Sequence, residues 1–358
     1  MLNKMSRVVA VAALLAGAAA TVQSPALAAP KKEFTMAWTV YVGWMPWPYA
    51  VDAGIVKKWA DKYKIKINVI QINDYVESLN QFTAGKIDAV TAANMDALTV
   101  PAAGGVDTSA IIVGDFSNGN DGIVVKKGDG IASLKGQKIN LVELSVSHYL
   151  LARALNAAGL KEADVTTVNT SDSDIVGAFK AADTTAVVTW NPQLTEIKGS
   201  PGAKEIFDSS KIPGEIIDTT ILRGDVLADN PNFAKALTGI WYETIALMAK
   251  HDQAGDTART AMAKLSGTDL PGFDGQLKTT RMFYDPKEAV AFTSGADLVK
   301  TMDMVRTFSF AHGLLGEGAK TADAVGMSFP GGKTLGDAKN LKLHFDPRFM
   351  DMAAKGEL

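Results

Sequence analysis

Strand-like and helix-like segments alternate along this chain, and that alternation limits the folds open to it more than any other feature. The run at Ile65–Ile72 is rich in β-branched residues, and Tyr75–Ala84 after it has helical periodicity and ends at Gly85. Three more strands and an amphipathic helix are predicted downstream: Ile87–Thr91, Lys138–Val142, Ala186–Thr189 and the helix His148–Ala158. This order predicts an α/β protein with mainly parallel sheets and helices on both faces.

The length of the chain predicts two lobes, because 358 residues exceed what one hydrophobic core usually holds. Beyond Thr220 the pattern becomes helical, beginning with Asn230-Pro231, a cap residue followed by a proline suited to a first helical turn. We expect residues 29–122 to form the first part of lobe 1 and residues 123–217 to form lobe 2. Residues 218–358 are expected to return to lobe 1 and to pack a helical carboxyl-terminal region on it.

The first 28 residues have the composition of a cleavable signal peptide. Lys4 and Arg7 precede an apolar stretch at residues 8–22, and Ala26-Leu27-Ala28 is a small-x-small cleavage pattern. The chain contains no cysteine, which excludes disulfides and a lipid-anchored amino-terminal cysteine. We therefore expect an exported periplasmic protein that is not a lipoprotein. Cleavage would remove two positive charges and no acidic ones and change the formal net charge from −3 to −5, which argues against a nucleic-acid partner.

Aromatic residues follow the first predicted strand directly. Trp44, Trp47 and Tyr49 are separated by Pro46 and Pro48, which we expect to stiffen a loop. Such a loop can form one wall of a pocket for a small flat ligand, or a hydrophobic plug over the core. Another tryptophan, Trp190, follows a later strand in the same way. In open α/β sheets ligands bind beyond the carboxyl ends of the strands, which favours the pocket.

The segments that follow the predicted strands contain acidic residues and no Lys or Arg. The acidic residues are Asp74, Glu77, Asp96, Asp115, Asp121, Glu143, Asp172, Asp174 and Asp218. A pocket lined by aromatic rings and carboxylates suits a planar cation, because guanidinium stacks on aromatic faces and donates forked hydrogen bonds to carboxylates. Urea is planar but neutral, so it compensates the burial of a carboxylate less well.

Two passages, FTAGKIDA at Phe82–Ala89 and LKGQKI at Leu134–Ile139, resemble the periplasmic solute-binding proteins of ABC importers in the nitrate/sulfonate/taurine group. The longer passages NDYVESLNQFTAGKIDA, NMDALTVPAAGGVDT and VELSVSHYLLARAL are similar to the binding component encoded beside urea carboxylase-type (guanidine carboxylase) enzymes. The resemblance implies a two-lobed type II binding-protein fold, a membrane permease as partner and a monomeric state. It also implies a small nitrogen-rich solute, guanidinium or urea, and no cofactor.

One residue departs from the pattern of anion-binding members of that group, which typically offer a glycine- or serine-rich loop at the start of the first helix of the second lobe. Here Glu143 stands at that position, followed by Ser145, Ser147 and His148. A carboxylate there would repel nitrate or a sulfonate. The departure therefore favours a cationic solute.

These observations select a set of candidate ligand-binding residues. We expect tryptophans to stack on the solute, carboxylates to pair with its charge, and amide or hydroxyl groups to hydrogen-bond to it; His148 is included, with a supporting role as the commoner alternative. The set is Trp44, Trp47, Asn73, Asp74, Asn94, Asp96, Glu143, Ser145, His148, Trp190, Asn191 and Asp218.

Several of these polar residues have a structural alternative. Asp74, Asp96, Ser147 and Asp172 stand where helix caps belong, and capping is the commoner role of such residues. Asp218 is equally suited to a salt bridge at the hinge. Three other acids, Asp52, Asp115 and Asp121, are expected to be solvated or to form turns.

The sequence offers little support for catalysis or metal binding. There is no cysteine nucleophile, and the adjacent Ser147 and His148 would point in different directions on a helix. His251, His312 and His344 are isolated, so no metal site is expected. An enzyme acting on a urea or amidine substrate, and a periplasmic scaffold or sensor with a vestigial cleft, are retained as alternatives to a solute receptor.

Overall fold

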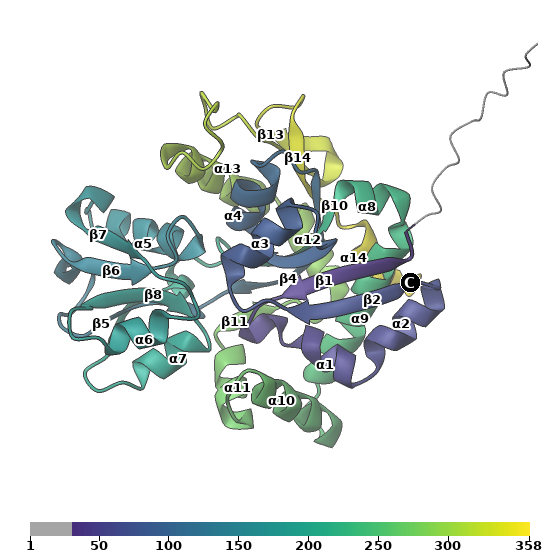
Figure 1. Ribbon diagram of the computed structural model, residues 1–358, viewed down its shortest axis with the longest axis horizontal. Coiled ribbons are helices and arrows are strands. Elements are labelled where there is room, and N and C mark those ends of the chain that lie inside the picture. The colour runs from purple at the N-terminus through teal and green to yellow at the C-terminus, as the bar shows by residue number, and fades with distance from the viewer. Residues whose placement is uncertain (1–30) are drawn as a thin grey trace, which may run out of the picture. The chain divides into compact units, whose positions relative to one another are not determined.

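The computed structural model describes residues 31–358; the predicted signal peptide lies outside the described residues. Two β-sheets organise the described part (Figure 1). We call the nine-stranded sheet with its helices the large lobe and the five-stranded sheet with its helices the small lobe. The chain crosses between the sheets at residues 118–120 and returns at residues 209–216.

The large sheet has the order β13-β12-β14-β4-β10-β3-β1-β2, with β11 paired to β4 at the side. Its strands are β1 (Glu33–Trp38), β2 (Lys66–Gln71), β3 (Ala89–Ala93), β4 (Thr108–Ser117), β10 (Ile217–Arg223), β11 (Thr280–Met282), β12 (Gly326–Phe329), β13 (Lys333–Leu335) and β14 (Leu341–Phe345). The small sheet has the order β7-β6-β8-β5-β9. Its strands are β5 (Asp121–Val125), β6 (Lys138–Leu141), β7 (Thr166–Asn169), β8 (Ala186–Trp190) and β9 (Lys204–Asp208).

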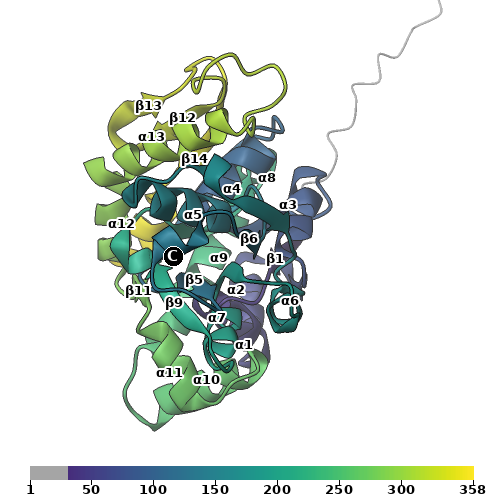
Figure 2. The same cartoon turned by 90° about the vertical axis from the view of Figure 1, so that its left-hand side faces the viewer.

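Helices cover both sheets. The large lobe carries α1 (Pro46–Asp52), α2 (Ile55–Tyr63), α3 (Tyr75–Thr83), α4 (Asn94–Ala97), α8 (Gly224–Asp229), α9 (Pro231–Met248), α10 (Gln253–Leu265), α11 (Leu270–Leu277), α12 (Pro286–Ser294), α13 (Ala296–Ala311) and α14 (Arg348–Lys355). The small lobe carries α5 (Val146–Ala157), α6 (Ile175–Lys180) and α7 (Gln193–Lys198). Figures 1 and 2 both show α10 with α11 at one end of the large lobe and α13 with β13 at the opposite end.

The central strands form because their sequences are apolar or small over their whole length. Every residue of β3, β5 and β8 is buried, as expected for strands covered on both faces. Helix α9 packs against α1 and α2, and Gly239 permits the close approach, since a Cβ at that position would lie 2.5 Å from the Trp59 ring. No helix within residues 31–358 is long and apolar enough to cross a membrane.

The predicted α/β class with two sheets is confirmed, and the structure refines it at three points. First, the sheets are mixed: β10 is antiparallel to β3 and β4, and β5 is antiparallel to β8 and β9, because the strands next to the crossings run back through each sheet. Second, the carboxyl-terminal third is not purely helical, since β11–β14 extend the large sheet. Third, the expected proline-stiffened loop is helix α1, with Pro46 in its first turn, where proline fits without breaking the helix.

Candidate functional site

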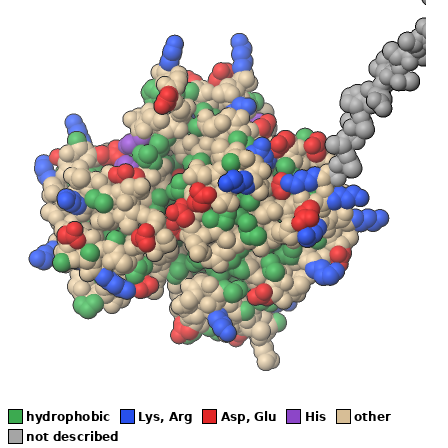
Figure 3. Space-filling view, in the orientation of Figure 1, with side chains coloured by type: hydrophobic (Ala, Val, Ile, Leu, Met, Phe, Trp, Pro, Cys, Tyr) green, Lys and Arg blue, Asp and Glu red, His purple; other side chains and the backbone are tan. Residues whose placement is uncertain are grey.

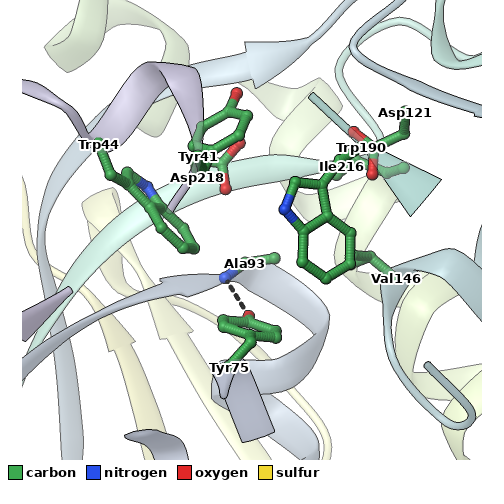
Figure 4. Close-up of a pocket in the computed structure, with 9 residues that line it drawn as sticks. All are labelled: Tyr41, Trp44, Tyr75, Ala93, Asp121, Val146, Trp190, Ile216 and Asp218. Atoms are coloured by element: carbon green, nitrogen blue, oxygen red, sulfur yellow. Dashed lines mark hydrogen bonds between the residues drawn. The ribbon is translucent and has the colours of Figure 1, made fainter. Parts of the chain in front are cut away.

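The chain forms a small cavity where the two lobes meet, and its walls come from the ends of several strands. The lining residues are Tyr41, Trp44, Tyr75, Ala93, Asp121, Val146, Trp190, Ile216 and Asp218 (Figure 4). Strand pairing accounts for this convergence: Ala93 at the end of β3 pairs with Asp218, and Trp190 at the end of β8 pairs with Asp121. The cavity therefore lies at the edge where ligands bind in open α/β sheets.

The space inside the cavity is small. A volume of about 20 Å³ is open to the centre of a water-sized sphere. About 10–15 Å³ of space is needed to hold one water molecule, so the cavity suits only a very small solute.

Four aromatic side chains enclose this space. The rings of Tyr41 and Trp44 meet edge to face with centroids 5.0 Å apart, and Tyr75 lies 5.8 Å from Trp44 and 5.9 Å from Trp190. In Figure 4 the rings of Trp44, Tyr75 and Trp190 surround the space, and the Asp218 carboxylate lies beside Tyr41. Rings in this arrangement present π-faces and edges to a ligand, which favours flat and cationic groups.

The two tyrosines donate their hydroxyl hydrogens to carboxylates behind the cavity wall. Tyr41 Oη donates to Asp115 Oδ1 at 2.7 Å, and Tyr75 Oη donates to Asp96 Oδ2 at 2.8 Å. Gly43 permits the first contact, because a Cβ there would lie 2.4 Å from the Tyr41 ring and 2.7 Å from Asp115. Burial and the neighbouring carboxylates raise the pKa of both tyrosines, so both remain neutral donors.

Four carboxylates are buried at or behind the cavity. Asp96, Asp115, Asp121 and Asp218 are all less than 7% exposed. Burial raises the pKa of Asp96 and Asp115 to about 7 and that of Asp121 to about 6. Asp115 and Asp218 are strand partners in β4 and β10, and burial followed by the charges of Asp115 and Asp121 raises the pKa of Asp218 well above its usual range.

No positive side chain within the described residues balances these acids. None of the ion pairs within residues 31–358 involves any of the four carboxylates, although the chain forms many ion pairs elsewhere. Isolated carboxylates in an apolar environment carry a large desolvation cost unless they are protonated or paired with a cation. The empty site therefore favours protonated carboxyls, and a cationic ligand can take the place of those protons.

The amino-terminal end of α5 already faces a negative group. Burial raises the pKa of Asp96, and the Tyr75 hydroxyl and the nearby Val146 backbone N–H offset only part of that effect by favouring the charged carboxylate. Val146 is the first residue of α5, so a carboxylate of the large lobe lies at the positive end of a helix of the small lobe. An anionic ligand at that helix terminus would meet Asp96.

The structure brings three of the predicted site residues to the cavity and one directly behind it. Trp44, Trp190 and Asp218 line the space, and Asp96 supports Tyr75. Trp47 lies on α1, fully buried with its ring 5.6 Å from Trp241, and does not reach the cavity.

Other predicted residues hold loops and helix ends. Asp74 caps α3 by accepting from the Glu77 N–H at 2.8 Å, and Ser145 caps α5 through the Ser147 N–H. Asn94 hydrogen-bonds to Glu215 O and Ile217 N at the return crossing.

The remaining predicted residues also lie away from the cavity. Asn191 Oδ1 accepts from the backbone N–H and the hydroxyl of Thr195, and Asn73 is exposed beside Gln71. The side chain of Glu143 accepts a hydrogen bond from Thr167 in a separate surface depression that Asp74 also lines. His148 contacts Glu162 instead.

Two expectations about acids are wrong, and two aromatic residues were missed. Asp115 and Asp121 are buried rather than solvated, because Asp115 lies within β4 and Asp121 begins β5 next to Ser117. Tyr41 and Tyr75 were not among the candidates. Their positions directly after a strand and directly after the cap residue Asp74 would have indicated them, since these are positions from which side chains reach a sheet edge.

Comparison with known proteins identifies a family and a fold. The family model described as NMT1/THI5 like matches residues 62–254. A Brucella abortus (strain 2308) protein, provisionally named as a binding protein, is 31% identical over 172 residues. That match covers 44% of this chain and 53% of the relative, so the chain spans about half the length of the curated relatives it matches.

Solved structures with the same fold have low sequence identity to this chain. The alkanesulfonate-binding protein of Xanthomonas axonopodis pv. citri, bound to MOPS, is similar with a TM-score of 0.67 and 20% identity, covering 83% of this chain and 99% of that one. The periplasmic nitrate-binding protein of Synechocystis PCC 6803 is similar with a TM-score of 0.56 and 13% identity, covering 92% and 100%. At these identities the likeness concerns the two-lobed fold.

Proposed function

This chain belongs to the NMT1/THI5-like family, and on that basis we propose that it is the periplasmic solute-binding protein of an ABC importer. The binding-protein names of its relatives and the two-lobed fold support this role over that of an enzyme. In this role the lobes close on a solute at the cavity, and a membrane permease recognises the closed form.

We infer that the solute is a small planar cation, with guanidinium favoured. The observation that carries this inference is the group of four buried carboxylates around an aromatic cavity, with no compensating positive side chain among the described residues. A guanidinium ion supplies the missing charge, stacks against indole or phenol rings, and donates paired N–H groups to Asp218. Its small size also suits a small cavity.

The acidic site distinguishes this chain from the structural neighbours named for sulfonate and nitrate. An anion would add negative charge to a site whose carboxylates already carry raised pKa values. It would also compete with Asp96 for the amino-terminal end of α5. We therefore expect no measurable affinity for nitrate or taurine.

Urea is the second candidate. The Asp115–Asp218 pair holds a proton when the site is empty, and a protonated carboxyl can donate to the urea oxygen. Urea does not neutralise the remaining carboxylates, so we expect it to bind more weakly than guanidinium.

A thermal-unfolding scan of residues 29–358 tests the proposal. Guanidinium, urea, nitrate and taurine are compared with buffer at equal ionic strength. A ligand at 100 times its dissociation constant stabilises the protein by about 2.7 kcal/mol, and we expect guanidinium to raise the midpoint by about 3–6 °C. A shift with an anion alone would contradict the charge argument, and the absence of any shift would favour a scaffold or sensor role.

The size of the cavity predicts discrimination against substituted guanidines. One added methyl group must be fitted into a well-packed site, which costs about 1–3 kcal/mol, so methylguanidine should bind about 5- to 150-fold more weakly than guanidinium. Isothermal titration calorimetry gives both dissociation constants. Ile216→Val removes one methylene from the cavity wall and should reduce this difference, whereas equal affinities in the natural chain would show that the cavity does not set the size limit.

A further inference from the structure

A second cluster of titratable groups joins the lobes away from the cavity. It consists of His148 on α5, Glu162 in the short 3-10 helix Glu162–Asp164, and His312 at the carboxyl-terminal cap of α13. His148 Nε2 lies 2.9 Å from Glu162 Oε1, and His312 Nε2 lies 2.8 Å from Glu162 Oε2. The first two residues belong to the small lobe and His312 belongs to the large lobe, so the cluster spans the boundary.

The hydrogen bonds of the two imidazoles define their protonation. The Leu144 backbone N–H donates to His148 Nδ1 at 3.2 Å, so the hydrogen of neutral His148 is on Nε2, which lies 2.9 Å from Glu162 Oε1. His312 Nδ1 lies 2.8 Å from the Phe308 carbonyl oxygen, which can only accept, so His312 carries a proton on Nδ1. Its Nε2 then donates to Glu162 only when His312 is an imidazolium. The contact between the lobes therefore requires one additional proton, on His312.

The same contacts argue against a metal ion at this cluster. A metal at Nε2 of both rings needs an Nε2 lone pair from His148, but the Leu144 N–H holds His148 in the tautomer that has a hydrogen there. The nitrogen–oxygen distances of 2.8–2.9 Å are those of charge-assisted hydrogen bonds. The geometry thus matches a shared proton network.

The other charged groups near the cluster have partners of their own. Arg153 on α5 forms a bidentate pair with Glu215, which also accepts from Tyr149, and Asp303 on α13 pairs with Arg306. Lys161 and Asp164 flank Glu162, and Asp164 pairs with Lys135. Glu162 is therefore the carboxylate that faces both histidines.

Packing around the cluster couples it to the relative position of the lobes. The Phe308 ring of α13 lies 5.2 Å from Tyr149 and 6.0 Å from His148 on α5, and 4.0 Å from His312. Figure 3 shows histidine atoms at the surface where the part that holds β5–β8 meets the part that holds α13. Because His312 and Glu162 belong to different lobes, a relative movement of the lobes changes the distance between them.

We propose that Glu162 and His312 form a proton-operated latch that holds the two lobes together when His312 is protonated. Its role does not depend on which solute fills the cavity. Hydrogen bonding from His148, with the charge of His312, holds the pKa of Glu162 below its usual range. A carboxyl group whose pKa is lowered in the folded state stabilises the fold at pH values above its unfolded-state pKa. This stabilisation is lost as the pH falls through the folded-state pKa. The latch also needs both ring protons of His312, so the loss of one of them opens it.

Distance measurements between the lobes test the latch in the ligand-free protein. The chain has no cysteine, so spin labels attach only at the introduced residues. Lys57→Cys in the large lobe and Asp183→Cys in the small lobe then give the distance between the lobes. Pulsed electron–electron resonance should show a closed fraction at least about threefold larger at pH 6 than at pH 8. Glu162→Gln should show, at both pH 6 and pH 8, the distance distribution that the natural chain has at pH 8.

Two controls distinguish the latch from a general effect of pH and from closure by a bound metal ion. His344→Gln removes a histidine that also faces a carboxylate, Asp107, but within the large lobe, and it should leave the distances unchanged. A pH response that persists in Glu162→Gln would overturn the proposal. Closure induced by Zn²⁺ at pH 8, and lost in His312→Gln, would overturn it as well, because a metal and not a proton would then join the lobes.

Discussion

Asp218→Asn is expected to lower guanidinium affinity by about 30- to 5,000-fold. Removing the charge of one partner of a buried, hydrogen-bonded ion pair costs about 2–5 kcal/mol, and Asp218 is one of the two carboxylates, with Asp121, that line the cavity. Asparagine keeps the shape and one oxygen acceptor, so the loss reports on charge rather than on packing. Titration calorimetry at pH 8 measures it.

The same substitution should leave the ligand-free protein at least as stable as the natural chain. Asp218 is buried beside Asp115 without a positive partner among the described residues, so asparagine removes the free-energy cost of either ionising this carboxyl or keeping it protonated. Lower affinity combined with an unchanged or higher unfolding midpoint distinguishes a ligand contact from damage to the fold. A fall in both would indicate that Asp218 has a structural role instead.

Matched variants on the same lobe boundary serve as controls. Asp74→Asn and Glu143→Gln alter acids that are not at the cavity. Both should keep affinity within about twofold of the natural chain, with at most the small stability loss of a weakened cap or hydrogen bond. A large affinity loss in Glu143→Gln would place the solute near Glu143 and contradict the cavity assignment.

Guanidinium affinity is expected to rise steeply with pH. The empty site holds protons on carboxyls whose pKa values are raised to about 6–7, and a bound cation displaces them. Protons therefore compete with the ligand, and affinity should fall about tenfold per pH unit for each proton displaced once the pH is below those values. Between pH 8 and pH 5 we expect a decrease of at least about 100-fold.

Calorimetry in buffers of different ionisation enthalpy measures the protons released on binding. We expect about one proton per guanidinium near pH 6.5, and less release in Asp218→Asn. The ligand-free protein should lose stability as the pH rises from about 4 to 7, because raised carboxyl pKa values favour the folded state only while the protons are bound. Affinity that is independent of pH would favour a neutral solute such as urea.

Much of the fold followed from local patterns in the sequence. The alternation of β-branched runs with helical periodicity predicted β2–α3–β3 and β6–α5 to within two residues at each end, because caps and glycine stops act within a few residues. Helix α1 was missed because aromatic residues and two prolines indicate a loop, although Pro46 fits a first helical turn. The mixed direction of the sheets was missed because strand direction depends on connections between distant segments.

The sequence predicted the residue types of the candidate site better than it predicted the particular residues. An aromatic and acidic pocket without Lys or Arg followed from residue types at strand ends, as did Trp44, Trp190 and Asp218. The structure shows Asp74 as a helix cap and Trp47 as a core residue. The sequence was compatible with these structural roles and with ligand binding, because helix capping and ligand binding both use polar residues at helix and strand ends.

The sequence by itself determined the α/β class, the excess of acids at the strand ends and the absence of cysteine, because these depend on composition and short-range periodicity. Only the tertiary structure decided which acids converge. The antiparallel pairing of β4 with β10 places Asp115 opposite Asp218, and that of β5 with β8 places Asp121 opposite Trp190. Burial then gives chemically identical carboxyl groups different properties. Asp218 is buried and has a raised pKa, because it lacks the water that surrounds an exposed residue such as Asp52.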